Sequence, residues 1–244
     1  MAPKTILLAT GNAHKVAEIR AILGNRFRFV ALNDFAGVPA VAENASTFSG
    51  NATRKATGIA RWASAALLQG LPAMREKIHD ETSTFVLADD SGLEVDALNG
   101  APGVRSARFA AETANSGNTP DAENLAKLLR LMKPVPQEQR TARFRCAVAI
   151  TPLAGGTIEN ASPVCYSDEY EVATQIFEGT CEGRIAESPS GAAGFGYDPV
   201  FIPAGHSRSF AELGDELKHQ LSHRGKALAL LRKAISTGRL PGLP

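Results

Sequence analysis

The chain has 244 residues, of which 44% are hydrophobic and 21% are charged, and its formal net charge at pH 7 is +1. These values are typical of a globular protein, and a chain of this length can bury a substantial core without disulfides. The near-neutral charge, with no basic tail or block of Lys and Arg, disfavours a nucleic-acid-binding surface. No apolar run is long enough to cross a membrane, and three widely spaced cysteines without a secretory signal favour reduced thiols in the cytoplasm.

The N-terminal segment predicts a strand, a short polar turn and a helix. Residues 5–9 read as the strand, residues 10–12 interrupt it, and residues 14–23 carry apolar side chains at helical spacing. A turn of this kind can bind phosphate, because its amides and the helix N-terminus offer N–H groups and partial positive charge. Lys15 adds a full charge at the same place. The alternative is an ordinary capped helix with a solvated Lys15.

The next segments predict an edge strand, a loop and a long helix. Residues 27–32 alternate between apolar and polar positions, and residues 33–46 have the composition of a loop. Over residues 47–69 an apolar stripe predicts the helix. Asn51 and Lys55 lie one turn apart on this helix and therefore share a face.

The most informative stretch is FVLADDSGLEVDALNGAPGVRSARF, residues 85–109. Its short apolar run, residues 85–88, predicts a buried strand that ends at Asp89 and Asp90, at the rim of a sheet where open α/β folds bind ligands. Two adjacent carboxylates repel each other, so a proton, a Lys or Arg, or a metal such as Mg²⁺ should neutralise them. Because side chains alternate along a strand, one acid should face the site. The alternative is a turn in which these residues bond only to their own backbone.

The C-terminal half predicts a helix over residues 119–132, strands over 142–151 and 170–177, and a final helix over 222–235. Between the last two lies GFGYD, residues 194–198, which places an aromatic ring between two glycines. A flat ligand could approach both the ring and the backbone there, and the loop's acid could accept from ring N–H groups. The alternative is a glycine-rich turn with its ring in the core.

Three basic side chains lie just before and at the start of the final helix, namely Lys218, His223 and Arg224. Such a cluster at a helix N-terminus indicates a site for an anion or a base edge. The alternative is an ordinary solvated helix start.

Five segments, in this order, resemble one family: LATGNAHKVAEIRAIL, TFSGNATRKA, LADDSGLEVDALNGAPGVRSARF, GFGYDPVF and LSHRGKALALL. The family is the inosine triphosphate pyrophosphatases, also called Ham1-like or non-canonical purine NTP pyrophosphatases. The resemblance implies an α/β fold with an elongated mixed β-sheet flanked by helices, in a single domain (residues 1–244) of two lobes with a central cleft. It also implies a homodimer and Mg²⁺-dependent hydrolysis of ITP, dITP and XTP to the monophosphate and pyrophosphate.

The resemblance assigns roles to individual residues. Glu43 and Asp90 would bind Mg²⁺, and Asp90 would also act as the general base. The residues implied for substrate binding are Thr10, Gly11, Asn12, Ala13, His14, Lys15, Lys55, Ser91, Phe195, Gly196, Tyr197, Asp198, Lys218, His223 and Arg224. Among them, residues 10–15 and Lys55 would hold phosphate and Phe195 would stack on the purine. The three basic residues near the final helix would read the 6-oxo edge.

The sequence departs from the family pattern at two places. The family often has Glu where this chain has Gly50, so a carboxylate near the metal is missing. Residues 68–84 form a longer connection than relatives have and are interpreted as an insertion or a long loop. Two other functions stay open. One is a Maf-like pyrophosphatase acting on dTTP or UTP, which the GFGYD and SHR motifs disfavour, and the other is a nucleotide-binding protein that does not hydrolyse, which Gly50 favours.

Overall fold

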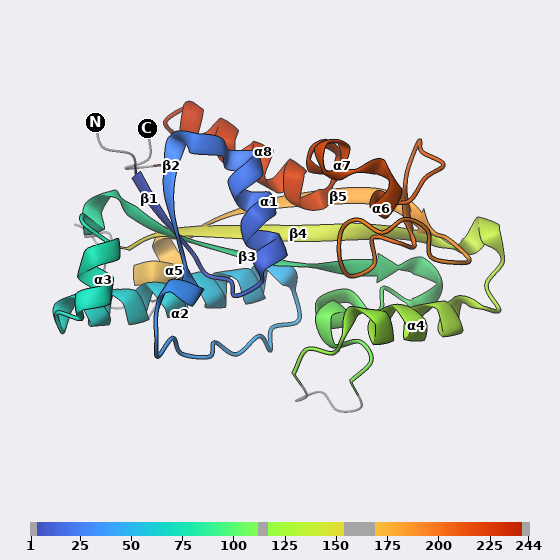
Figure 1. Cartoon of the computed structure of the whole chain (residues 1–244), viewed down its shortest axis with the longest axis horizontal. Helices are drawn as coiled ribbons and strands as arrows, with labels where there is room; N and C mark the ends of the chain where they lie inside the picture. Colours follow the sequence, from blue (N-terminus) through green and yellow to red (C-terminus); the bar gives the residue numbers. More distant parts are fainter. Residues whose placement is uncertain (1–3, 112–116, 154–168, 241–244) are drawn as a thin grey trace. The chain divides into compact units, whose positions relative to one another are not determined.

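The computed structural model describes residues 4–111, 117–153 and 169–240. Within them the backbone forms a mixed six-stranded sheet in the order β2-β1-β3-β4-β5-β6, with flanking helices (Figure 1). The strands are β1 (Lys4–Leu8), β2 (Phe27–Ala31), β3 (Thr84–Val95), β4 (Thr141–Pro152), β5 (Gln175–Ile185) and β6 (Phe201–Pro203). The helices are α1 (Ala13–Leu23), α2 (Phe48–Leu68), α3 (Pro72–Lys77), α4 (Asp121–Met132), α5 (Glu169–Ala173), α6 (Phe210–Leu213), α7 (Asp215–Leu221) and α8 (His223–Ser236).

The chain divides into two compact units. Unit 1 comprises Met1–Asp90, Ala147–Phe177 and Leu228–Pro244, and unit 2 comprises Ser91–Cys146 and Glu178–Ala227. Three strands, β3, β4 and β5, and helix α8 contribute residues to both units.

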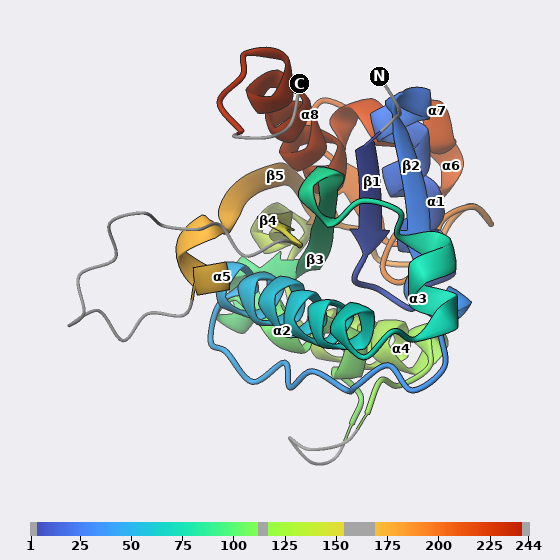
Figure 2. The ribbon, with the colours of Figure 1, turned by 90° about the vertical axis from the view of Figure 1, so that its left-hand side faces the viewer.

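In unit 1, β1 pairs in parallel with β2 on one side and with β3 on the other, and Ile6 is opposite both Phe29 and Phe85. The edge position expected for β2 is confirmed. Helix α1 lies on one side of this part of the sheet and α2 on the other (Figures 1 and 2). A parallel sheet covered on both faces needs apolar strands, and Ile6, Leu7 and Leu8 are fully buried.

Helix α2 forms as predicted. Thr47 caps it by accepting a hydrogen bond from the Gly50 amide at 3.1 Å, and the predicted apolar stripe is buried. The loop between β2 and α2 packs along this helix. At one point the Phe35 ring meets the Trp62 ring edge-on, with 5.6 Å between centroids. Further along, a Cβ added to Gly58 would lie 3.0 Å from a methyl group of Val41, so the loop closely approaches the helix there.

Residues 68–84 contain α3, which begins with Pro72, a residue suited to the first helical position. A 3₁₀ turn, Glu81–Ser83, follows. An open hollow of about 650 Å³ lies beside this segment and contains none of the candidate site residues. It is lined by Leu67, Arg75, Ile78, His79, Asp80, Glu81 and Thr82.

Two predicted strand boundaries are wrong. The strand expected to end before Asp89 continues through both acids to Val95, so the acids lie inside β3 and not at its end. The strand expected over residues 170–177 is helix α5 followed by β5, which continues to Ile185. In both cases contacts with distant segments outweighed the local pattern, because β3 pairs with neighbouring strands and Tyr170 of α5 bonds to Ser64 of α2.

In unit 2, one face of the sheet is apolar and the other is charged, as is common in sheets with one solvated face. The apolar face packs with α4 and α6 through Leu93, Val95, Leu128, Met132, Phe144, Phe201 and Phe210. On the charged face, Arg143 lies 2.8 Å from Asp96 and 3.1 Å from Glu182. Hydrogen bonds from Arg143 and Thr141 lower the pKa of Asp96.

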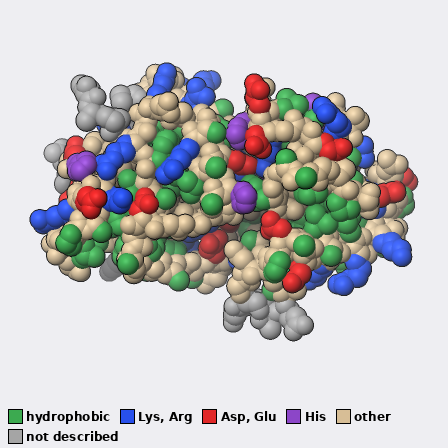
Figure 3. Space-filling view, in the orientation of Figure 1, with side chains coloured by type: hydrophobic (Ala, Val, Ile, Leu, Met, Phe, Trp, Pro, Cys, Tyr) green, Lys and Arg blue, Asp and Glu red, His purple; other side chains and the backbone are tan. Residues whose placement is uncertain are grey.

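Acidic and basic side chains are interspersed on the face of the protein drawn in Figure 3. Among the helices of the described part of the chain, none combines the length and the apolar character needed to cross a membrane.

Candidate active site

The turn between β1 and α1 is a capped helix start. Asn12 Oδ1 accepts from the amides of His14 (2.9 Å) and Lys15 (3.2 Å), and the Asn12 amide donates to Thr10 Oγ1 at 3.2 Å. The alternative expected from the sequence is therefore correct about the cap. It is wrong about Lys15, because the Lys15 ammonium lies 2.5 Å from Asp89 Oδ1 and its side chain is only 15% exposed.

The two adjacent acids of β3 have different cationic partners. Asp89 pairs with Lys15 of α1, whereas Asp90 accepts a 3.0 Å hydrogen bond from Asn51 Nδ2 and lies 3.7 Å from the Lys55 ammonium, both on α2. Neutralisation by lysine, one of the options left open by the sequence, is what the structure shows. The alternation of side chains along β3 sends the two acids toward different helices. The turn alternative is excluded, because both residues are paired strand residues.

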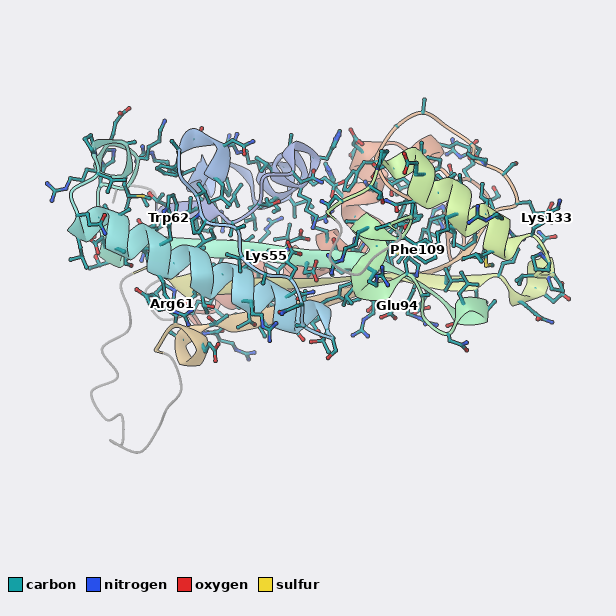
Figure 4. The ribbon with its side chains drawn as sticks, turned by 90° about the horizontal axis from the view of Figure 1, so that it is seen from below. Lys55, Arg61, Trp62, Glu94, Phe109 and Lys133 are labelled. Carbon is teal, nitrogen blue, oxygen red and sulfur yellow. The ribbon has the colours of Figure 1, made fainter. Side chains whose placement is uncertain are left out.

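The Lys55 ammonium brings together groups that are far apart in the sequence. It lies 3.2 Å from Glu43 Oε2 and 3.7 Å from Asp90 Oδ1, and it donates to the Asp89 carbonyl oxygen at 2.7 Å. Lys55 lies between the two ends of α2 (Figure 4). Because both carboxylates approach one nitrogen, their oxygens can be no farther apart than those two distances combined. The two expected metal ligands are therefore neighbours.

The electrostatic surroundings of Asp90 suit a carboxylate that acts as a general base and binds a metal cation. Burial raises the pKa of Asp90, while Lys55, Lys15 and the Asn51 hydrogen bond act in the opposite direction and Glu43 adds to the rise. A carboxylate with a raised pKa accepts a proton more readily than an ordinary one. No group of three or more His, Cys, Asp or Glu among the described residues could hold a metal ion. Two carboxylates are nevertheless the protein ligands that Mg²⁺ typically takes, alongside water and substrate phosphate, so Glu43 and Asp90 fit this ion.

In unit 2, the GFGYD loop is organised by Asp198. Its Oδ2 accepts from the Phe195 amide at 2.9 Å and from the Lys218 ammonium at 2.7 Å. The Lys218 ammonium lies 4.6 Å from the centroid of the Phe195 ring, and the Arg224 guanidinium lies 5.9 Å from it. Gly194 has φ +78°, and a Cβ there would lie 2.2 Å from the Asp198 carboxylate, so a side chain at this position would break the arrangement.

Two anchors of this loop could not be found from motifs. The buried Tyr197 hydroxyl donates to the Ser106 carbonyl oxygen at 2.9 Å, so Tyr197 holds the loop from inside. The Gly196 amide donates to Asp121 Oδ2 at 2.7 Å. Ser106 lies within the informative stretch of residues 85–109, but its residue type gave no sign of this contact, and Asp121 lies outside the quoted motifs.

The basic residues near the final helix are buried. Lys218 and His223 are each at most 5% exposed, and Arg224 is 1% exposed. Arg224 Nη2 donates to Ser91 Oγ at 2.9 Å, and the His223 ring stacks on the Phe144 ring with 4.7 Å between centroids. The alternative of a solvated helix start is therefore wrong. Of the expected substrate-binding residues, residues 10–15 and Lys55 belong to unit 1, and Ser91, residues 195–198, Lys218, His223 and Arg224 belong to unit 2.

Residues 6–234 match the model of the Ham1 family. The chain belongs to the Ham1 family. A dITP/XTP pyrophosphatase of Geobacillus kaustophilus is 43% identical to this Ham1 protein over 229 residues, which cover 93% of this chain and 92% of that protein. A solved HAM1 protein from Coxiella burnetii has a TM-score of 0.71 and 34% identity, covering 96% of this chain and 99% of its own. The Staphylococcus aureus Ham1 protein has a TM-score of 0.68 and 31% identity, covering 96% and 100%. The resemblance and the mixed α/β fold expected from the sequence are confirmed.

Proposed function

We propose that this Ham1 family protein is a hydrolase that cleaves non-canonical purine nucleoside triphosphates, namely ITP, dITP and XTP, to the monophosphate and pyrophosphate. The observation that carries the proposal is the meeting of Glu43 and Asp90 at the Lys55 ammonium. Phosphoryl transfer depends mainly on alignment and charge neutralisation, and this cluster supplies both acids and a cation. The relatives named dITP/XTP pyrophosphatases support the substrate class.

Glu43 and Asp90 would hold a Mg²⁺ ion, which would neutralise triphosphate charge and lower the pKa of a bound water. Asp90 would take the proton of the water that attacks the α-phosphorus, a role supported by its raised pKa. The Asn51 amide occupies Asp90 Oδ2, so the other oxygen, which lies toward Lys55, is the one assigned to this chemistry.

The pyrophosphate that leaves carries negative charge, which Lys15 and Lys55 would stabilise. Residues 10–14 would add the partial positive charge of the α1 N-terminus. Substrate phosphate would compete with Asp89 for Lys15, because these two side chains are paired in the structure.

Phe195 and the basic side chains beside it would bind the purine base of the nucleotide. The Phe195 ring offers a stacking surface, and Lys218, His223 and Arg224 are candidate donors toward O6 of a 6-oxo purine. The 6-amino group of adenine would meet a donor where the site requires an acceptor, and such unpaired polar groups discriminate strongly. Ser91, which accepts a hydrogen bond from Arg224, would also contact the substrate.

The test is release of pyrophosphate from ITP, XTP, GTP, ATP and dTTP, with Mg²⁺ and with EDTA. We expect Mg²⁺-dependent cleavage of ITP and XTP, and an Asp90→Asn variant should lose about 10²- to 10⁴-fold in turnover. Asp96→Asn, which changes an exposed acid just after the same strand, is the matched control and should retain activity. Preference for dTTP would favour the Maf-like alternative. Binding of ITP without cleavage would favour a protein that does not hydrolyse.

The homodimer implied by the family resemblance and the cytoplasmic location expected from the cysteines and the lack of a secretory signal stay predictions. A chain of 25.7 kDa should then give twice that mass in light scattering coupled to size-exclusion chromatography. A monomer at micromolar concentration would contradict the dimer prediction without affecting the proposed chemistry.

A further inference from the structure

We propose that Asn51 is a positioning residue that ties the loop carrying Glu43 to Asp90, so that the two metal-binding carboxylates stay together. This inference rests on the proposed function for the meaning of the site. It concerns a side chain that would touch neither metal nor nucleotide.

The carboxamide of Asn51 makes two hydrogen bonds that join separate segments. Its Nδ2 donates to Asp90 Oδ2 on β3 at 3.0 Å, and its Oδ1 accepts from the Ala45 amide in the loop at 2.9 Å. Asn51 is 0% exposed, and its bond to Asp90 is buried, whereas the bond from the Ala45 amide is partly buried. Inside a protein a hydrogen bond to a charged group contributes more than an exposed neutral one.

The chemistry of the two partners requires an amide at this position. An ionised Asp90 only accepts, so it must face the NH₂ group, and the Ala45 N–H only donates, so it must face the carbonyl oxygen. The opposite orientation of the amide would place two acceptors together and two donors together. An aliphatic side chain at position 51 would leave the Ala45 amide and the carboxylate without these partners.

The loop between β2 and α2 has no helix or strand between its 3₁₀ turn, Leu32–Asp34, and Thr47, so its course depends on where it is attached to α2. Phe35 packs on Trp62 near one end, and Ala45 bonds to Asn51 near the other. Ala45 lies two residues after Glu43. Fixing its amide therefore fixes the backbone that presents the Glu43 carboxylate to Lys55.

The first test is metal binding without nucleotide, measured by titration calorimetry with Mg²⁺ or by the electron paramagnetic resonance of bound Mn²⁺. Residues that orient metal ligands typically change affinity 10- to 100-fold, so we expect Asn51→Ala to bind the ion about 10- to 100-fold more weakly. Turnover of Asn51→Ala should recover when Mg²⁺ is raised to saturation. Ser46→Ala, which removes an exposed hydroxyl of the same loop, is the control and should bind the ion within about twofold of wild type.

Equal metal affinity in Asn51→Ala and wild type would overturn the inference, and so would an equal loss in Ser46→Ala. A second measurement needs no variant. In wild-type protein, the Ala45 amide should exchange with deuterium about tenfold or more slowly than the amides of Asn44 and Ser46. Exchange at the same rate would also overturn the inference. Both readouts omit nucleotide, so failure to hydrolyse ITP would count against the proposed function alone.

Discussion

The Lys55→Met variant tests whether the Lys55 ammonium weakens the binding of a divalent cation at Glu43 and Asp90 or strengthens it. The Lys55 ammonium sits between the two candidate metal ligands, Glu43 and Asp90, and its side chain is 12% exposed. Met has similar length and packs in the same way, but it carries no charge. We expect the variant to bind Mg²⁺ more tightly than wild type and yet to turn over slowly, because it lacks a cation for the phosphates.

The magnitude follows from the two ion pairs that the metal would have to weaken. At an effective dielectric constant of about 20, unit charges 3–4 Å apart interact by roughly 4–5 kcal/mol. The Glu43 side chain is 38% exposed, so solvent and side-chain entropy reduce the net contribution of its pair to about 1 kcal/mol or less. The longer contact to the buried Asp90 adds a similar amount. Removing about 1.4 kcal/mol of competition corresponds to roughly tenfold higher Mg²⁺ affinity.

Calorimetric titration of Mg²⁺ into nucleotide-free protein measures this directly. With Mg²⁺ far above both dissociation constants, tenfold tighter binding also adds about 1.4 kcal/mol to the stabilisation that the ion provides. Pyrophosphate release should fall about 10²- to 10³-fold, as when a donor to developing negative charge is removed. Lys233→Met, on an exposed position of α8, is the matched control. Weaker Mg²⁺ binding by Lys55→Met would refute the reasoning, because Lys55 would then gather the carboxylates for the metal.

Three further outcomes are expected. A Cβ on Gly50 would lie 2.8 Å from the Ala45 Cβ and 3.0 Å from Thr47 Oγ1, so Gly50→Glu should lower the melting temperature, and adding Ala45→Gly should restore part of it. Arg140→Met should lower the free energy of unfolding in urea by about 3 kcal/mol or more, because the buried guanidinium donates to four carbonyl oxygens. Burial raises the pKa of Cys181 to about 11, so at pH 8 about one thiol in a thousand is ionised, and peptide mass spectrometry should show slow alkylation by iodoacetamide.

The elements with strong local signals were predicted well. Thr47 caps α2, the apolar stripe of that helix is buried, and the alternating segment after α1 is the edge strand β2. The shared face of Asn51 and Lys55 followed from helical spacing alone, and both side chains meet Asp90. These features depend on residues close together in the sequence, so the local pattern of residue types was sufficient to predict them.

The errors concern residues whose partners lie elsewhere in the chain. Asp-Asp-Ser-Gly is typical of a turn, but Lys15 and Lys55 come from two different helices and neutralise the acids, so the strand continues through them. Helix α5 was missed because the residues before β5 alternate as a strand would, whereas the Tyr170 hydroxyl bonds to Ser64 of α2. Arg224 and Lys218 are likewise buried by packing against distant parts of the chain, which the residue pattern at the start of a helix cannot predict.

The formal charges around β3 indicate which of its two adjacent acids, Asp89 or Asp90, should bind the metal. Asp89 and Lys15 form a neutral pair, with one carboxylate for one ammonium. Asp90 shares the single Lys55 ammonium with Glu43, so these three side chains carry one negative charge in excess. Burying unbalanced charge is costly, and a divalent cation together with the anionic substrate would relieve that excess. The same count predicts no metal at Asp89, where a divalent ion would have to displace Lys15 from a short ion pair whose carboxylate is fully buried. This count supports the proposal that Asp90, and not Asp89, serves the metal and the general base, while Asp89 holds Lys15 beside the turn of residues 10–12.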